Sequence, residues 1–236
     1  MAWAVETLNN TVDQELAALP DDMRARFVRI AELIESAGLP SVGEPHVKHI
    51  QGPLWEIRLK GKAGIARALY VTAKGQRAVV VRVFVKKTQK TPNSEIRPEA
   101  SEGAGKMTKV KDLHRRWMKE PGYKAEYEAL DEEFQLARTL IEARIRAGLS
   151  QTDLACRMET SQSYVARIES GEVQPSTAAL SRFAHATGSR LKIIFEPAKA
   201  AANSERKAMA SRPATFKTAS RSAKKRVVAK RSRPKS

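Results

Sequence analysis

The stretch from Gly148 to Leu180 constrains the fold most, because its residues predict two short helices separated by a tight turn. Ser150 precedes the first helix, Gln151–Met158, and Ser161 precedes the second, Gln162–Glu169. A serine in this position caps a helix by accepting a hydrogen bond from a first-turn N–H group. Apolar residues at helical spacing would form the buried seam between the helices: Leu154, Ala155, Met158, Val165 and Ile168.

The polar end of the second predicted helix carries residue types that read DNA. A helix that enters the major groove places its N-terminal side chains against base edges. Gln matches adenine and Arg matches guanine, each pairing contributing roughly 1–3 kcal/mol of discrimination. The segment resembles the helix-turn-helix of the phage repressor/Cro (XRE) family. The resemblance implies DNA contacts from Gln151, Ser161, Gln162, Ser163, Tyr164 and Arg167, with Gln151 on a phosphate. The alternative is a small helical bundle that binds no DNA.

The turn between these helices departs from the family pattern at Glu159, where the family usually has glycine. A residue other than glycine in a left-handed turn costs about 1 kcal/mol. The carboxylate would also lie near the DNA phosphates. Distortion of the turn at Glu159 would therefore weaken the DNA-binding interpretation.

The first part of the chain changes from a helical to an alternating pattern. A short strand over residues 3–8 and two helices, over 11–19 and from 21 or 22 to 38, come first. Residues 54–60 then alternate, with Trp55, Ile57 and Leu59 on one face and Glu56, Arg58 and Lys60 on the other. Two further strands follow over 65–73 and 77–87, separated by glycine-containing turns. This region is predicted to be an α+β domain with an antiparallel three-stranded meander.

Composition and charge suggest where the domains meet. Residues 91–106 are rich in Pro, Gly, Ser and Glu, which favours a linker over 97–106 between domains at 1–96 and 107–198. The second domain is predicted to be largely helical, with a helix capped by Asp112, an amphipathic stretch over 123–147, the helix-turn-helix at 148–180 and a strand over 190–196. Residues 199–236 carry 13 of the Lys and Arg residues against a single Glu, and we expect this basic tail to be disordered. It would either bind nucleic acid non-specifically or be a solvated tail.

A second resemblance covers nearly all of residues 1–96. The runs WEIR at 55–58, VFVKKTQKTP at 83–92 and EI at 95–96 resemble the phage-derived HigB branch of the RelE-like toxins, which are ribosome-dependent mRNA interferases. Residues 107–198 resemble the HigA antitoxins, and Met107 is placed like an antitoxin start. Cleavage of RNA through its 2′-OH needs a proton acceptor and cations around the phosphate. The candidate catalytic residues are Lys48, Glu56, Arg58, Arg67, Lys86 and Lys87, and Trp55 or Phe84 could stack a base. The alternative for each is a solvated sheet residue.

Three functions remain open at this point. The first is a toxin–antitoxin fusion that binds its operator as a homodimer and represses its own operon, with a silenced or degenerate interferase. The interferase is expected to be silenced or degenerate because the related toxins carry a basic terminal helix, which Pro98 and two nearby glycines oppose here. The second is an active, ribosome-dependent mRNA endonuclease controlled by its own antitoxin half. The third is an interaction protein that neutralises free toxin or binds free antitoxin.

Other classes of function are disfavoured by the sequence. Cys156 is the only cysteine, which excludes an internal disulfide and fits a reducing cytoplasm. We expect the protein to be cytoplasmic and associated with the nucleoid. We find no phosphate loop, metal-ligand cluster or membrane-length apolar run, so we expect no cofactor, no metal and no membrane partner.

Overall fold

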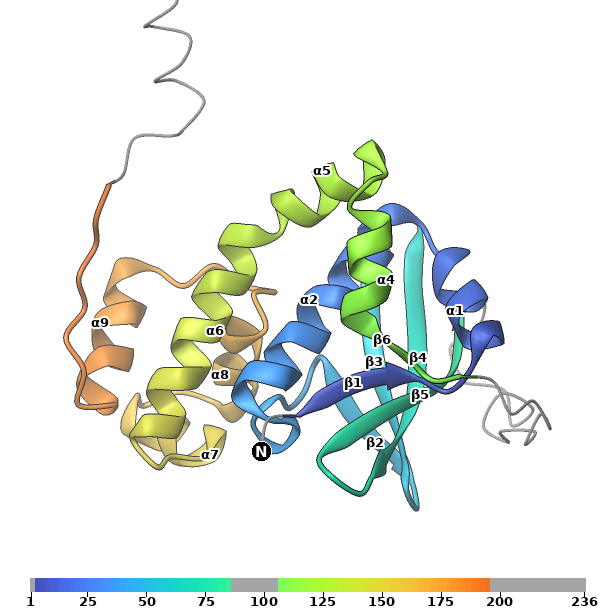
Figure 1. Cartoon of the computed structure of the whole chain (residues 1–236). Coiled ribbons are helices and arrows are strands. Elements are labelled where there is room, and N and C mark those ends of the chain that lie inside the picture. Colours follow the sequence, from blue (N-terminus) through green and yellow to red (C-terminus); the bar gives the residue numbers. More distant parts are fainter. Residues whose placement is uncertain (1–2, 86–105, 196–236) are drawn as a thin grey trace, which may run out of the picture. The chain divides into compact units, whose positions relative to one another are not determined.

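The computed structural model describes residues 3–85 and 106–195. Within them, a mixed sheet is built from β1 (Ala4–Thr7), β2 (Val47–Gln51), β3 (Leu54–Gly61), β4 (Gly64–Ala73), β5 (Arg77–Val85) and β6 (Thr108–Lys109), in the order β2-β3-β4-β5-β1-β6 (Figure 1). The antiparallel meander of β3, β4 and β5 is the one that the sequence predicts.

The rest of the sheet differs from the sequence prediction. Strand β1 pairs with β5 in parallel, and β6 pairs with β1 antiparallel, so that Thr7 lies opposite Thr108. Strand β2 adds to the edge at β3. The sequence pattern predicts neither β2 nor β6. In β2 only Val47 is buried, so the strand has no row of apolar residues on one face, and β6 has only two residues. Strand β6 forms by pairing with β1, far away in the chain, which local patterns do not reveal, whereas β2 forms a hairpin with β3, the next strand along the chain.

Two helices of the first half pack around the sheet. Helix α1 (Asn10–Ala17) is capped by the Asn9 side chain, which accepts from the Val12 amide at 3.1 Å. Helix α2 (Asp21–Ala37) ends at Gly38, whose φ of 85° is readily adopted by glycine, and leads into a 3-10 turn, η1 (Leu39–Ser41). The buried side of α2 packs on the face of the sheet that carries Ile57 and Leu59.

The second half is helical, as predicted, but its boundaries differ. It contains α4 (Val110–Trp117), α5 (Pro121–Ala129), α6 (Asp131–Arg146), α7 (Gln151–Arg157), α8 (Gln162–Glu169) and α9 (Thr177–Ala186). Asp112 lies in the first turn of α4 and is not its cap, since α4 begins at Val110. The predicted stretch over 123–147 is two helices that meet at Leu130.

The strand predicted for residues 190–196 is wrong for its described part, because residues 190–195 are not in a strand. Ile193 and Ile194 are more than half exposed, and Phe195 is 94% exposed. Their β-branched and aromatic side chains favour a strand, but a strand also needs a partner. Among the described residues, no helix is long and apolar enough to cross a membrane.

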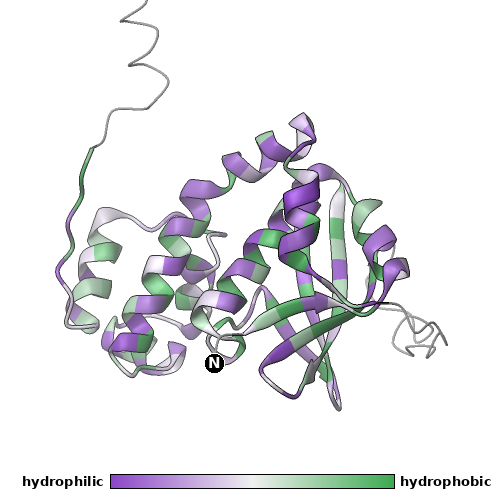
Figure 2. Cartoon of the chain, viewed as in Figure 1, coloured by the Kyte–Doolittle hydropathy of each residue, from purple (hydrophilic) through white to green (hydrophobic). Residues whose placement is uncertain are grey.

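One hydrophobic core joins the two halves. It contains the inner residues of the sheet and α2, and it extends without interruption to Val110, Leu113, Trp117, Tyr123 and Phe134 of the second half. A second core lies inside the helix-turn-helix region, around Leu154, Val165 and Phe183. Figure 2 shows the apolar residues grouped on strands and along one side of the helices. The described residues up to Leu191 thus form one compact unit by their contacts, although the domain limits at 96, 106 and 198 remain predictions.

Candidate nucleic-acid interfaces

The helix-turn-helix is formed by strong local signals. The Ser150 hydroxyl accepts from the Asp153 amide at 3.1 Å, and the Asp153 carboxylate accepts in return from the Ser150 amide at 3.0 Å. This reciprocal capping box begins α7 and lowers the pKa of Asp153, mainly through its bond with the Ser150 hydroxyl. Ser161 caps α8 by accepting from the Tyr164 amide at 3.2 Å.

The turn between α7 and α8 is left-handed at Glu159, as the sequence predicts, with φ of 53°. The turn is regular, because the Thr160 amide donates to the Ala155 carbonyl at 3.0 Å and the Glu159 amide donates to the Cys156 carbonyl at 3.1 Å. These bonds satisfy carbonyls that the end of α7 leaves open. The glutamate therefore keeps the turn geometry that glycine would give and bears a conformational cost of about 1 kcal/mol.

The predicted reading residues of α8 divide into two groups. Gln162, Ser163 and Arg167 are exposed, whereas Tyr164 is half-buried against the second core. The hydroxyl of Ser161 is engaged in capping and lies 3.1 Å from that of Ser163. The surface that can meet a base edge thus consists of Gln162, Ser163 and Arg167.

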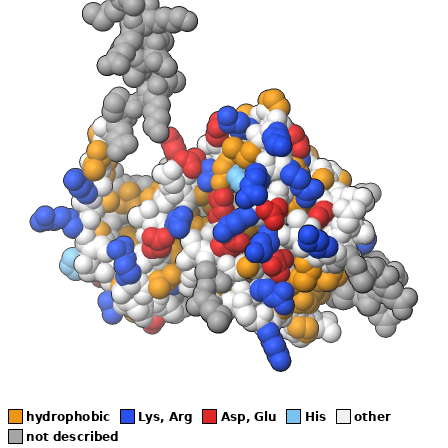
Figure 3. Space-filling model, viewed as in Figure 1, with side chains coloured by type: hydrophobic (Ala, Val, Ile, Leu, Met, Phe, Trp, Pro, Cys, Tyr) orange, Lys and Arg blue, Asp and Glu red, His pale blue; other side chains and the backbone are white. Residues whose placement is uncertain are grey.

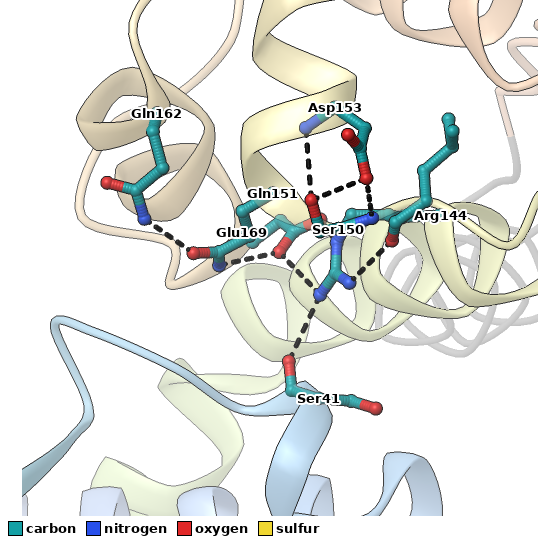
Figure 4. Close-up of polar contacts among 8 residues, drawn as sticks. Ser41, Arg144, Ser150, Gln151, Asp153, Gln162 and Glu169 are labelled. Carbon is teal, nitrogen blue, oxygen red and sulfur yellow. Dashed lines mark hydrogen bonds and ion pairs between the residues drawn. The ribbon is translucent and has the colours of Figure 1, made fainter.

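A chain of hydrogen bonds links Gln162 to the interior (Figure 4). Its Nε2 donates to Gln151 Oε1 at 2.8 Å, and Gln151 Nε2 donates to Glu169 Oε2 at 3.0 Å. Glu169 is in turn paired with Arg144 at 2.7 and 3.0 Å. Arg144 and Glu169 are 6% and 2% exposed, so this ion pair lies inside the protein.

Sequence reasoning missed Arg144 and Glu169. They are 25 residues apart, and each lies in a helix whose pattern does not distinguish a buried charge from a solvated one. The available signal was that Arg144 falls among the buried residues of α6, beside Leu140 and Ile141. A cation in that position needs an anion from elsewhere in the fold.

The candidate RNA site lies on the face of the sheet opposite α2. Both carboxylate oxygens of Glu56, which is fully buried, are engaged: Oε1 by Arg58 Nε at 2.6 Å and Oε2 by Arg67 Nη1. Lys48 lies opposite Glu56 in the neighbouring strand and is exposed. Four of the predicted catalytic residues are therefore brought together. Each oxygen of Glu56 keeps a second lone pair, so what separates Glu56 from a 2′-OH is its complete burial and not its two ion pairs.

The predicted stacking residues lie on different faces. Phe84 is opposite Arg67 in the sheet register and shares its face. Trp55 points to the α2 side, where its ring stacks with Tyr70 at 6.4 Å and meets His49 at 4.8 Å. Because successive residues of a strand alternate between faces, Trp55 cannot act beside Arg58. Lys86 and Lys87 lie outside the described residues.

Comparison with known protein families separates the same two regions. Residues 14–99 match the family of phage-derived Gp49-like proteins, which is of the RelE/HigB toxin type, and residues 135–189 match a helix-turn-helix domain. The chain joins a Gp49-like domain to a helix-turn-helix domain. This arrangement matches a toxin–antitoxin fusion whose second half binds DNA. Comparison with curated proteins gives no match.

The two halves of the fusion meet mainly on α2 of the Gp49-like domain. Three of its arginines pair with acids of the second half: Arg24 with Glu120 at 2.7 Å, Arg26 with Glu133 at 2.7 Å and Arg29 with Asp131 at 2.8 Å. Figure 3 shows cationic and acidic side chains interleaved across the middle of the molecule. The charges thus complement each other where the halves meet.

Aromatic residues of α4 and α5 strengthen this contact. The Arg29 guanidinium lies 3.7 Å from the centre of the Tyr127 ring, and the Tyr127 hydroxyl donates to Glu32 at 2.6 Å. Burial raises the pKa of Tyr127, so its hydroxyl stays protonated and remains a donor. Strand β6 adds a third contact, with the Thr108 hydroxyl donating to Asp13 at 2.9 Å.

His46 of the Gp49-like domain is buried against the helix-turn-helix domain. Its Nε2 lies 3.0 Å from the Ser170 carbonyl, and its ring stacks on Phe134. Burial, with a smaller contribution from Arg26, lowers the pKa of His46 to about 4. The ring is therefore neutral at neutral pH and donates its Nε2 proton to the carbonyl. Among the described residues, no group of three His, Cys, Asp or Glu side chains could hold a metal.

A hollow of about 710 Å³ lies where the sheet edge faces α5, α6 and the loop after α8. Arg58 and Lys60 line it from the sheet, and Glu126 and Glu133 line it from the helices. Lys62 bonds to Glu126 across this boundary, which raises the pKa of Lys62. Around the hollow, the two halves are joined by Arg26–Glu133, by Lys62–Glu126 and by His46 with the Ser170 carbonyl.

Proposed function

We propose that this protein is a sequence-specific DNA-binding autorepressor whose Gp49-like domain is held in one arrangement by its own helix-turn-helix half. The observation that carries the proposal is the exposed row of Gln162, Ser163 and Arg167 on a capped, well-packed helix. These residue types match adenine and guanine edges in the major groove. In this proposal the protein acts in the cytoplasm, where it binds a two-fold symmetric operator as a homodimer.

The test is a gel-shift titration of the full-length protein on DNA from upstream of its own coding sequence, with non-specific competitor. Gln162→Ala and Arg167→Ala are each expected to weaken specific binding by about tenfold or more, because each removes a base contact of roughly 1–3 kcal/mol. Thr152→Ala, at an exposed position of α7, is the control. Equal binding by all four proteins would contradict the proposal.

A second function is favoured by one specific observation. The second half docks on α2 and β1, whereas Glu56, Arg58 and Arg67 lie on the sheet face opposite α2. This docking leaves Lys48, which lies opposite Glu56, exposed to a substrate, although Glu56 itself is buried and Arg58 also lines the hollow that faces α5 and α6. The alternative is therefore an mRNA endonuclease that acts on ribosome-bound mRNA and is regulated by its attached partner.

Cleavage of mRNA during cell-free translation tests this alternative. Addition of the full-length protein would produce cut mRNA, and Arg67→Ala would abolish the cuts by removing a cation beside Glu56. Lys74→Ala, in the exposed turn between β4 and β5, is the matched control. Intact mRNA with the wild-type protein, at concentrations that saturate the ribosomes, would rule the alternative out.

A further inference from the structure

A loop of the Gp49-like domain touches the DNA-reading end of the helix-turn-helix. The Ser41 carbonyl accepts from Arg144 Nη2 at 3.0 Å (Figure 4). A Cβ atom on Gly43 would lie 3.5 Å from Gln151 Oε1 and 3.8 Å from its Nε2. The space left between this loop and Gln151, Ala166 and Glu169 is only about 10 Å³. The loop thus packs directly against the groups that hold Gln151, with room for at most one water.

Arg144 connects the loop to the reading residues. It donates to Ser41, to the Leu149 carbonyl at 3.2 Å and through two bonds to Glu169. A buried guanidinium with this many partners is held in one orientation, and it holds the carboxylate of Glu169. The Ser41 carbonyl is the one partner of Arg144 among these that comes from the Gp49-like domain.

The carboxylate then determines how both glutamine amides are turned. A carboxylate only accepts, so Gln151 must present its NH₂ group to Glu169 and its oxygen to Gln162. Gln162 must therefore donate with one N–H, which leaves its oxygen and its second N–H for a base. An adenine edge requires one acceptor and one donor in this arrangement.

We propose that residues 41–43 of the Gp49-like domain, at the end of η1 and just after it, are a positioning element of the DNA site. Through Arg144, Glu169 and Gln151 it sets the amide of Gln162, so base choice at the position read by Gln162 depends on the docked toxin-type domain. This inference rests on the proposed DNA binding. Since coupling is reciprocal, DNA that engages Gln162 correctly also stabilises the docked loop.

Gly43 allows a test that leaves the helix-turn-helix sequence unchanged. Gly43→Leu adds a side chain directed at the Gln151 amide, whereas Gly43→Ala adds a Cβ at ordinary contact distance and is the matched control. Full-length proteins would first select their preferred site from a random double-stranded DNA library. Binding to the selected duplex, and to duplexes changed at single base pairs, would then be measured by fluorescence anisotropy, with Gln162→Ala marking the pair that Gln162 reads.

We expect wild type and Gly43→Ala to discriminate at that base pair by about tenfold or more, and Gly43→Leu to lose this discrimination while keeping that at other positions. Full discrimination by a folded Gly43→Leu protein would overturn the inference and leave the proposed function intact. Enrichment of no sequence by the wild type would overturn the proposed function itself.

Hydrogen exchange on the wild-type protein provides a second measurement that needs no variant. The Val47 amide donates to the Gly43 carbonyl at 3.2 Å, so its exchange reports on the loop. The selected duplex should slow exchange over residues 39–47 more than a duplex changed at the pair read by Gln162. Equal protection by both duplexes would contradict the inference.

Discussion

At the scale of single residues, His46 makes stability depend on pH. Its pKa is about 4 in the folded protein and 6.5 when unfolded, so the unfolded chain binds the proton more tightly. Stability contributed by the neutral ring is complete above pH 6.5 and is lost as the pH falls toward 4, by about 3 kcal/mol in total. Urea denaturation of the wild type across this window should show the loss.

The matched variant for this prediction is His46→Gln, which can still donate to the Ser170 carbonyl but does not titrate. The charged groups that face this region, including Arg26 and its partner Glu133, are the same in both proteins. The difference between the two proteins therefore isolates the ring. Parallel pH profiles for both would show that His46 is not the group responsible.

Glu159 offers a prediction of the opposite sign. Glu159→Gly removes the conformational cost of a left-handed residue, about 1 kcal/mol, from the folded protein. Glycine also makes the unfolded chain more flexible, which offsets part of this gain. We therefore expect the free energy of unfolding to rise by roughly 0–1 kcal/mol. Gly148, with φ of 68° and nothing within 4 Å of its would-be Cβ, provides the converse test. Gly148→Ala should destabilise by about 1 kcal/mol. Thermal unfolding of both variants measures the two effects, and a stabilised Gly148→Ala would refute this account of the turns.

At the scale of elements, the contact between α2 and α5 should depend on Arg29 far more than on surface charge pairs. Arg29 contacts the Tyr127 ring, donates to the Tyr127 carbonyl at 3.0 Å and pairs with Asp131. Arg29→Ala is expected to cost about 2–4 kcal/mol, because it leaves a cavity and unsatisfied partners.

The control for that prediction is Arg138→Ala. Arg138 pairs with Glu142 on the exposed side of α6, where such pairs contribute about 0.3–0.5 kcal/mol. Urea titration followed by tryptophan fluorescence would report the change, since Trp117 lies in the shared core beside Arg24. Similar losses in Arg29→Ala and Arg138→Ala would mean that the halves are not held at α2.

The elements also show what sequence alone can and cannot predict. The sequence predicts where α7 and α8 begin because Ser150 and Ser161 act within three residues of themselves. It predicts the meander because alternation is local. Strand β6, the break at Leu130 and the pair Arg144–Glu169 depend on partners far away in the chain, and no local pattern carries that information. For the candidate sites, resemblance supplied the reading residues, but not the loop or the ion pair that orients them.

At the scale of the whole molecule, two kinds of DNA binding should be separable by salt. The net charge of +17 is concentrated in the basic tail, which lies outside the described residues. A protein that ends at Ala198 should lose most of its non-specific affinity for DNA. The slope of the logarithm of its binding constant against the logarithm of the salt concentration should become shallower by about 0.9 for each phosphate contact removed. Its preference for the selected sequence should remain.

Anisotropy titrations at several salt concentrations, on selected and scrambled duplexes, measure both quantities. The full-length protein is the reference for each slope. Loss of sequence preference in the shortened protein would place specificity in the tail and not in α8.

The core shared by the sheet, α2 and α4–α6 has a consequence for dosage. In a two-chain pair, the ratio of the partners varies with their separate synthesis and breakdown, and dilution separates them. Here each translated chain carries one copy of both halves, and their encounter is intramolecular, so it does not depend on cellular concentration. Release of the Gp49-like half would therefore require local unfolding or a cut in the chain, and neither follows from a change in expression level.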